Sequence, residues 1–158
     1  MKREQMTIFT DGSCYAADPE KRGGFGVYIQ WRNKEYSISQ GYTNTTISRM
    51  ELRGILFALR SIKTDIPTTV TIYSDSRYVV DLIRKKGFLW RTKELVCDNF
   101  DLVNNIFMEL DRHKKLRVKL WWIPGHGKDF NDPLVYGNFI ADFLAKYDQQ
   151  ESYIKDSK

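Results

Sequence analysis

The stretch QMTIFTDGSCYAADPEKRGGFGVYIQWRNKEYSISQGY, residues 5–42, holds three runs of β-branched and aromatic residues separated by turn residues. The runs cover residues 5–10, 25–31 and 35–42. Arg32-Asn33-Lys34 joins the last two and has the length of a hairpin connection. The pattern predicts that the chain opens with three consecutive antiparallel strands.

Leucine and isoleucine then recur at steps of three and four residues, which predicts a helix. The residues concerned are Leu52, Ile55, Leu56, Leu59 and Ile62. Ser48 and Glu51 have the spacing of a capping box, so we expect this helix to start near residue 48.

Patterns further along the chain predict a strand over residues 68–74, helices over 77–85 and 93–110, a strand over 116–122 and a last helix over 138–147. This order predicts an α/β fold with a five-stranded mixed sheet and helices packed on its faces. We expect one domain over residues 1–148, followed by a polar, disordered tail over 149–158.

Composition excludes several classes of protein. With 158 residues, 42% hydrophobic and 28% charged, the chain is neither disordered nor fibrous. No apolar run approaches the ~18 residues of a membrane helix, and no secretory signal precedes the first strand. The 2 cysteines, Cys14 and Cys97, are too few for a disulfide framework and too scattered for a zinc site. A cytoplasmic protein without a membrane partner is therefore expected.

The net charge of +5 favours an acidic partner such as nucleic acid. Two basic runs, within residues 84–93 and 112–119, contain no acid. Solvated surface charge explains these runs equally well.

Two acids lie where strands end. Asp11 precedes Gly12 at the end of the first strand, where an aspartate often only nucleates a turn. Asp75 ends the fourth strand, where it could cap the next helix.

Two further acids lie on predicted helices. Glu51 shares the apolar side of its helix with Ile55, although the helix dipole also favours an acid in the first turn. Asp142 lies between Phe139 and Phe143, on either the buried or the wet side of its helix.

Clustered carboxylates repel one another, so a site built from these four acids requires a cation. Oxygen ligands alone favour Mg²⁺ or Mn²⁺, and paired ions about 4 Å apart serve phosphoryl transfer.

The chain has 2 histidines. His113, within Asp111-Arg112-His113-Lys114-Lys115, is expected to be a solvated loop residue. His126 follows Pro124-Gly125 just past a strand end, where it could shuttle a proton or simply be exposed.

Five segments together carry a resemblance to a known family. They are TIFTDGSC (7–14), RMEL (49–52), IYSDSRYV (72–79), WIPGHG (122–127) and NFIAD (138–142). In this order and spacing, over nearly the whole chain, the sequence resembles type 1 ribonuclease H.

The resemblance implies the ribonuclease H-like fold and a monomeric enzyme that cuts the RNA strand of an RNA–DNA hybrid. Two Mg²⁺ ions, for which Mn²⁺ can substitute, would be the cofactors, and the products would carry 5′-phosphate and 3′-hydroxyl ends. Asp11, Glu51, Asp75 and Asp142 match the metal-binding catalytic acids, and His126 matches a catalytic loop histidine.

Contacts with the hybrid are expected from several residues. Backbone at Gly12 and Ser13 could contact the 2′-hydroxyls that distinguish RNA from DNA. The resemblance makes Asn138 a supporting polar residue, and further candidate substrate contacts are Ser48, Arg77, Lys85, Lys86 and Trp90.

The chain departs from the family pattern in four places. The segment after Cys14 contains Ala17-Asp18-Pro19 where an asparagine-proline is common, and it is about a residue longer. Ile47 and Ser48 stand where relatives often have two asparagines. The segment 127–137 is longer than expected and could pack over the site or alter product release. The basic region around residues 84–93 is shortened, and Trp90 within it either stacks on a sugar or anchors the loop to the core.

Two other functions remain open at this point. A resolvase, transposase core or reverse-transcriptase domain would share the fold, but the compact chain argues against these. A module that binds hybrids without cutting them would tolerate a chelator, whereas the presence of all four acids favours the enzyme.

Overall fold

A computed structural model describes residues 2–146 and 152–157. The elements, in chain order, are β1 (Glu4–Cys14), β2 (Gly23–Trp31), β3 (Lys34–Thr43), α1 (Ile47–Ser61), β4 (Thr68–Ser74), α2 (Arg77–Lys85), α3 (Gly87–Arg91), α4 (Phe100–Arg112), β5 (Leu116–Trp122), α5 (Pro133–Lys146) and β6 (Tyr153–Lys155). Within the described residues, no helix has the length and apolar character needed to cross a membrane.

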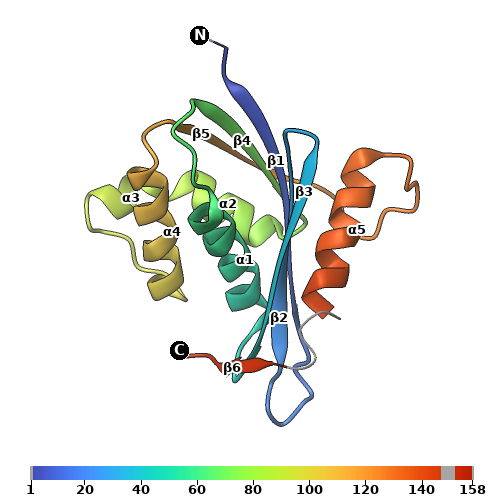
Figure 1. The fold of residues 1–158 in the computed structure, drawn as a ribbon. Helices are drawn as coiled ribbons and strands as arrows, with labels where there is room; N and C mark the ends of the chain where they lie inside the picture. Colours follow the sequence, from blue (N-terminus) through green and yellow to red (C-terminus); the bar gives the residue numbers. More distant parts are fainter. Residues whose placement is uncertain (1, 147–151, 158) are drawn as a thin grey trace.

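One mixed sheet organises the molecule, with strand order β5-β4-β1-β2-β3-β6. β1, β2 and β3 pair antiparallel, whereas β4 is parallel to both β1 and β5. Helices α1 to α4 lie on one side of the sheet and α5 lies on the other (Figure 1). The predicted α/β fold is therefore confirmed.

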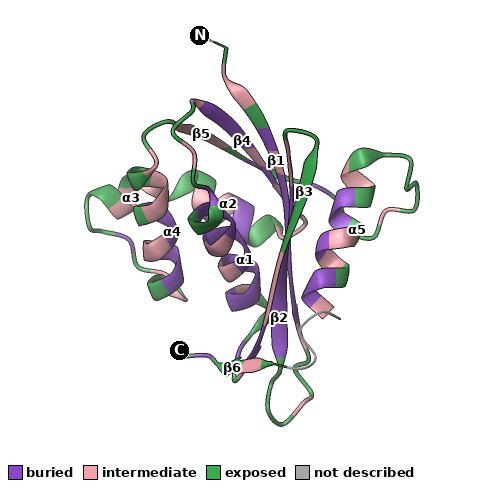
Figure 2. Ribbon diagram, viewed as in Figure 1, coloured by how far each residue is buried: buried purple, intermediate pink, exposed green. Residues whose placement is uncertain are grey.

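The sheet divides the core, and buried residues, drawn in purple, lie along its strands and in the helices on both of its sides (Figure 2). The larger cluster joins β-strand residues such as Ile8 and Val27 to Leu56 of α1 and Ile106 of α4. A smaller cluster beneath α5 includes Phe9, which stacks on Tyr28 and Tyr73. Rigid packing on both faces holds the strand ends in place.

Three helix boundaries differ from the predictions. Helix α1 begins at Ile47, because the side chain of Thr46, and not of Ser48, accepts a hydrogen bond from the Arg49 amide (3.2 Å). Helix α4 begins only at Phe100, because Asn99 just before it is in the left-handed region.

Helix α5 begins at Pro133, five residues before the predicted start at residue 138. Asp132 accepts a hydrogen bond from the Leu134 amide (2.9 Å), and proline is favoured in the first turn of a helix. Half of the predicted irregular loop is therefore helical.

The prediction of a disordered tail is wrong for residues 152–157; residues 149–151 and 158 lie outside the described residues. Strand β6 pairs parallel with Gly41–Thr43 of β3 and adds a sixth strand to the five predicted. Asp156 follows it with its side chain 0% exposed, paired with Arg49 and Arg53. The partners of this segment are about a hundred residues away along the chain, so no local sequence pattern predicts the strand.

Lowering the pH should reduce the folding stability of the protein, because Asp156 becomes protonated. Burial alone would raise the pKa of this carboxyl, but hydrogen bonds from Arg49, Thr45 and Arg53 lower it to about 2. Because the folded pKa lies below the unfolded one, the stabilisation is complete above pH ~4 and is lost as the pH falls toward 2. The stabilisation that is lost when Asp156 is protonated amounts to about 2 kcal/mol.

The measurement is urea unfolding of the wild type and Asp156→Asn at pH 7, 4, 3 and 2.5. The stability difference between the two proteins should shrink across the acid range. A difference independent of pH would contradict the prediction.

Candidate active site

Three carboxylates from three elements meet at one end of the sheet. Asp11 lies on β1, Glu51 on α1 and Asp75 directly after β4. One carboxylate oxygen from each lies within 4.8 Å of the other two. Asp11 and Glu51 are only 4% and 6% exposed. Such a cluster costs free energy unless a cation or protons neutralise it.

The topology explains the convergence. β1 and β4 are parallel and in register at Thr10 and Ser74, so Asp11 and Asp75 emerge at the same level. Gly12 lies against the start of α1, where a Cβ would come within 2.5 Å of the Glu51 backbone nitrogen. Because residue 12 has no side chain, the start of α1 can approach β1 closely, and Glu51 then lies next to Asp11.

The competing explanations for two of these acids are wrong. Ser76, and not Asp75, caps α2, accepting a hydrogen bond from the Val79 amide (3.4 Å). Glu51 lies inside α1 with its carboxylate in the cluster, so it does not cap the helix.

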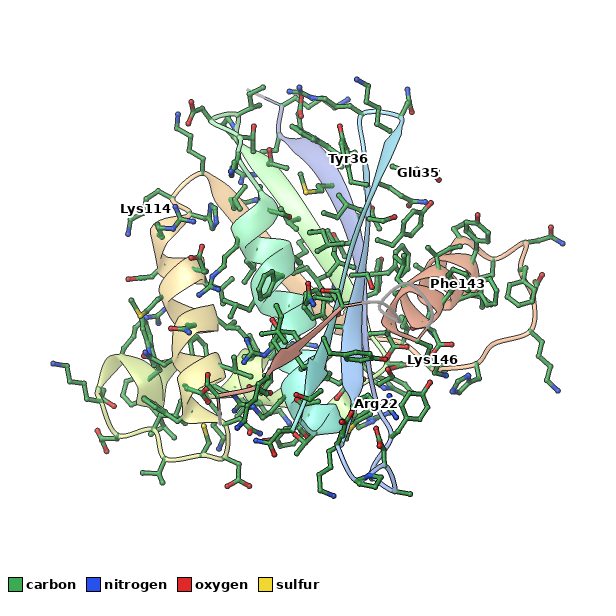
Figure 3. The ribbon with its side chains drawn as sticks, turned by 60° about the horizontal axis from the view of Figure 1, so that its bottom comes forward. Arg22, Glu35, Tyr36, Lys114, Phe143 and Lys146 are labelled. Carbon is green, nitrogen blue, oxygen red and sulfur yellow. The ribbon has the colours of Figure 1, made fainter. Side chains whose placement is uncertain are left out.

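Asp142 lines the same pocket, an open hollow of about 300 Å³, but it is not part of the tight three-acid cluster. One of its oxygens lies 2.9 Å from the Lys146 ammonium, one turn further along α5. Lys146 is labelled at the end of α5 in Figure 3, on the same side of the molecule as Arg22 and opposite Glu35 and Tyr36. The spacing of four residues could have predicted this ion pair from the sequence.

The electrostatics show how unfavourable the bare cluster is. Burial raises the pKa of Asp11, and the charges of Glu51, Asp75 and Asp142 raise it further. Burial and the charge of Asp75 likewise raise the pKa of Glu51. The pKa of Asp75 is raised by burial, although a hydrogen bond from Asn138 opposes the shift.

These residues fit a hard divalent cation. All the candidate ligands are oxygens, the donor type that Mg²⁺ and Mn²⁺ prefer. Glu51 Oε2 and Asn138 Oδ1 are buried without a hydrogen-bond partner among the described residues. A buried carboxylate oxygen without a partner is costly, and a bound cation would satisfy it.

His126 is exposed and lines the pocket beside Asp75. It is in the left-handed region (φ 57°), within the Pro124–Gly127 connection after β5. A Cβ at Gly125 would lie 2.7 Å from Asp75 Oδ2, so glycine allows this connection to pass close to the acid. The imidazole can therefore reach the reaction site.

The prediction for His113 is wrong, because this residue is half-buried at the end of α4. A ring nitrogen lies 3.0 Å from the Leu59 carbonyl oxygen and 3.4 Å from Glu109. Its role is to join α4 to α1.

The structure places the residues expected to contact the hybrid in different surroundings. Gly12 and Ser13 line the pocket, although the Ser13 hydroxyl donates to the Ala145 carbonyl (2.8 Å) and is not free for substrate. Trp90 lies in α3, packs on Phe107 and donates to Asn104 (2.9 Å), so it anchors α3 to α4.

The remaining candidates lie outside the residues that line the pocket. Arg77 is exposed and stacks on Trp122, with 4.0 Å from the guanidinium carbon to the ring centroid. Lys85 and Lys86 are exposed at the end of α2, and Ser48 is half-buried in α1. Their roles as substrate contacts stay predictions.

The long segment 127–137 does not cover the pocket. Phe130 packs edge-to-face on Phe139, and Tyr136 packs edge-to-face on Tyr28. Neither aromatic lines the pocket. Of the added residues, Pro133, Leu134 and Tyr136 are part of α5, and Phe130 packs against this helix.

Comparisons with known proteins identify the family of this chain. The family model described as RNase H matches residues 3–150. The ribonuclease H of Mannheimia succiniciproducens is 36% identical over 157 residues, covering 98% of this chain and 93% of that protein. The ribonuclease HI of Pasteurella multocida is 34% identical over 157 residues, covering 98% and 96%.

Solved structures show the same fold. The crystal structure of LC9-RNase H1, a type 1 RNase H with the type 2 active-site motif, has a TM-score of 0.67 at 22% identity, covering 92% of this chain and 72% of that one. The solution structure of the PFV RNase H domain has a TM-score of 0.70 at 21% identity, covering 91% and 93%. Because the family model and the bacterial relatives match nearly the whole chain, it belongs to the type 1 ribonuclease H family.

Proposed function

We propose that this protein is an endonuclease that hydrolyses the RNA strand of RNA–DNA hybrids with two divalent ions, Mg²⁺ or Mn²⁺, leaving 5′-phosphate and 3′-hydroxyl ends. The observation that carries the proposal is the buried cluster of Asp11, Glu51 and Asp75. All the acids come from one chain, so we also expect a monomer, and we expect it to act in the cytoplasm.

Asp11, Glu51, Asp75 and Asp142 would hold the ions. When bound, the ions would lower the pKa of a water molecule and stabilise the charge that develops on the phosphate. Asn138 donates to Asp75 and fixes the orientation of its carboxylate. Lys146 neutralises one oxygen of Asp142 and limits repulsion within the pocket.

Hydrolysis breaks the bond between phosphorus and the 3′-oxygen, and that oxygen must gain a proton as it leaves. His126 is exposed at the pocket edge and can deliver the proton to it. The backbone around Gly12, together with Ser48, would select RNA through its 2′-hydroxyl groups.

The test is cleavage of an end-labelled RNA–DNA hybrid beside matched RNA–RNA and DNA–DNA duplexes, in Mg²⁺, Mn²⁺ or chelator. Metal-dependent cutting of only the RNA strand of the hybrid is expected. Binding of the hybrid without cutting in either metal would favour the non-cutting module, and cutting of another duplex would reject the substrate.

His126→Ala is expected to slow turnover on the order of a hundredfold without abolishing it, because the leaving oxygen then takes its proton from water. Single-turnover cleavage measures the effect. His113→Ala is the matched control, since that ring contacts Leu59 and Glu109 away from the pocket. Equal rates for wild type and His126→Ala would show that His126 is an ordinary loop residue.

A further inference from the structure

The carboxylate of Asp156 lies at the centre of a buried polar network. It accepts hydrogen bonds from Thr45 Oγ1 (2.7 Å), from Arg49 Nε and Nη2 (2.9 and 3.0 Å), and from Arg53 Nη2 (2.6 Å). The Asp156 side chain is 0% exposed, and the Arg49 side chain is 2% exposed. Removing one member of such a network leaves uncompensated charges in a buried place.

Arg49 is also held from the other side. Its Nη1 and Nη2 donate to the two carboxylate oxygens of Asp101 at the start of α4 (3.0 and 2.8 Å). Asp101 and Asp156 together balance the charges of Arg49 and Arg53. The guanidinium of Arg49 therefore has a single, well-determined orientation.

The backbone around Asp156 is set by the sheet. Its amide donates to the Thr43 carbonyl (2.9 Å), directly after the pairing of β6 with β3. Gln40 Nε2 also donates to the Ser152 carbonyl (3.1 Å). The carboxylate is thus presented from a fixed strand, and the contacts position α1 relative to that strand.

Residues 45–49, which Asp156 anchors at both ends, border the active-site pocket. Thr45 and Arg49 lie on either side of residues 46–48, which form the corner where β3 leads into α1. Ile47 within this corner is 50% exposed and lines the pocket together with the acids. The corner carries Ser48, the residue expected to contact the groove of the hybrid.

We propose that Asp156 is a positioning residue for hybrid binding: by holding Thr45 and Arg49, it keeps the corner of residues 46–48 in the conformation that contacts the substrate. This inference rests on the proposed function. Glu51 has a separate anchor in the close approach of Gly12 to the backbone of Met50 and Glu51. Loss of Asp156 should therefore weaken binding more than it slows the chemical step.

The test is steady-state hybrid cleavage by the full-length chain at a temperature where every variant is folded. Asp156→Asn should raise KM about fivefold and change kcat less than twofold. Thr45→Val removes one hydrogen bond and should raise KM about twofold, with little further increase in the double variant, because both substitutions release the same corner.

The control is Ile106→Val, a core substitution in α4 that lowers stability without touching this network. An unchanged KM in Asp156→Asn, or an equal rise in the control, would show that the network is only structural. A fall in kcat with a constant KM would also overturn the inference. Failure of the wild type to cleave hybrid would instead refute the proposed function, so the two failures are distinguishable.

Discussion

Asp75→Asn is expected to reduce hybrid cleavage at least about a thousandfold, equivalent to about 4 kcal/mol of transition-state stabilisation. Asp75 supplies one of the three clustered oxygens and also receives the hydrogen bond from Asn138. The amide has nearly the same shape but carries no charge, so it binds a divalent ion poorly. Single-turnover cleavage in Mg²⁺ measures the loss.

The same substitution should stabilise the fold when no metal is present. Burial raises the pKa of Asp75, so its folded pKa exceeds its unfolded value, and the ionised carboxylate costs stability above pH ~4. Asn removes this cost at neutral pH. We expect a higher urea midpoint for Asp75→Asn than for the wild type in the presence of a chelator.

Hybrid binding provides the second comparison. Fluorescence anisotropy should show that Asp75→Asn still binds the hybrid, because the contacting surfaces are unchanged. Substantial residual cleavage by this variant, or a lower urea midpoint, would contradict the role assigned to Asp75.

Gly12→Ala should damage both the stability and the activity of the protein. Its Cβ would lie 2.5 Å from the Glu51 nitrogen and 2.8 Å from the Met50 carbonyl carbon, both of which are backbone atoms. Relief requires α1 to move away from β1, which we expect to cost about 3 kcal/mol of unfolding free energy. A shift of about 1 Å at Glu51 should also reduce cleavage on the order of a hundredfold.

Gly54→Ala is the matched control. Gly54 lies in α1, about one turn after Met50 and Glu51, and faces the same strand, β1. Its Cβ would meet Thr10 Cβ at 3.4 Å and the Asp11 carbonyl oxygen at 3.6 Å, which are ordinary contacts. Because alanine favours a helix interior, stability should rise by about 0.5–1 kcal/mol. Similar urea midpoints for the two variants would contradict the close approach at Gly12.

Much of the fold was predictable because the relevant signals are local. The strand over residues 68–74 and the helix over 77–85 have the predicted boundaries. Alternation in strands and steps of three and four residues in helices reflect which side of one element is buried. The helix starts that were wrong, at α1, α4 and α5, depend on the single residues Thr46, Asn99 and Asp132.

The sequence by itself determined the α/β class, the order of the main strands and helices, and the acids that form the site, since each of these depends on residue types at short spacing. Only the tertiary structure decided that Asp142 lines the pocket beside the three-acid cluster without belonging to it, and that Trp90 is an anchor. It alone also joined Asp156 to Arg49 across 107 positions. Such contacts depend on which distant residues meet in space, and no periodic pattern along the chain shows which residues pair.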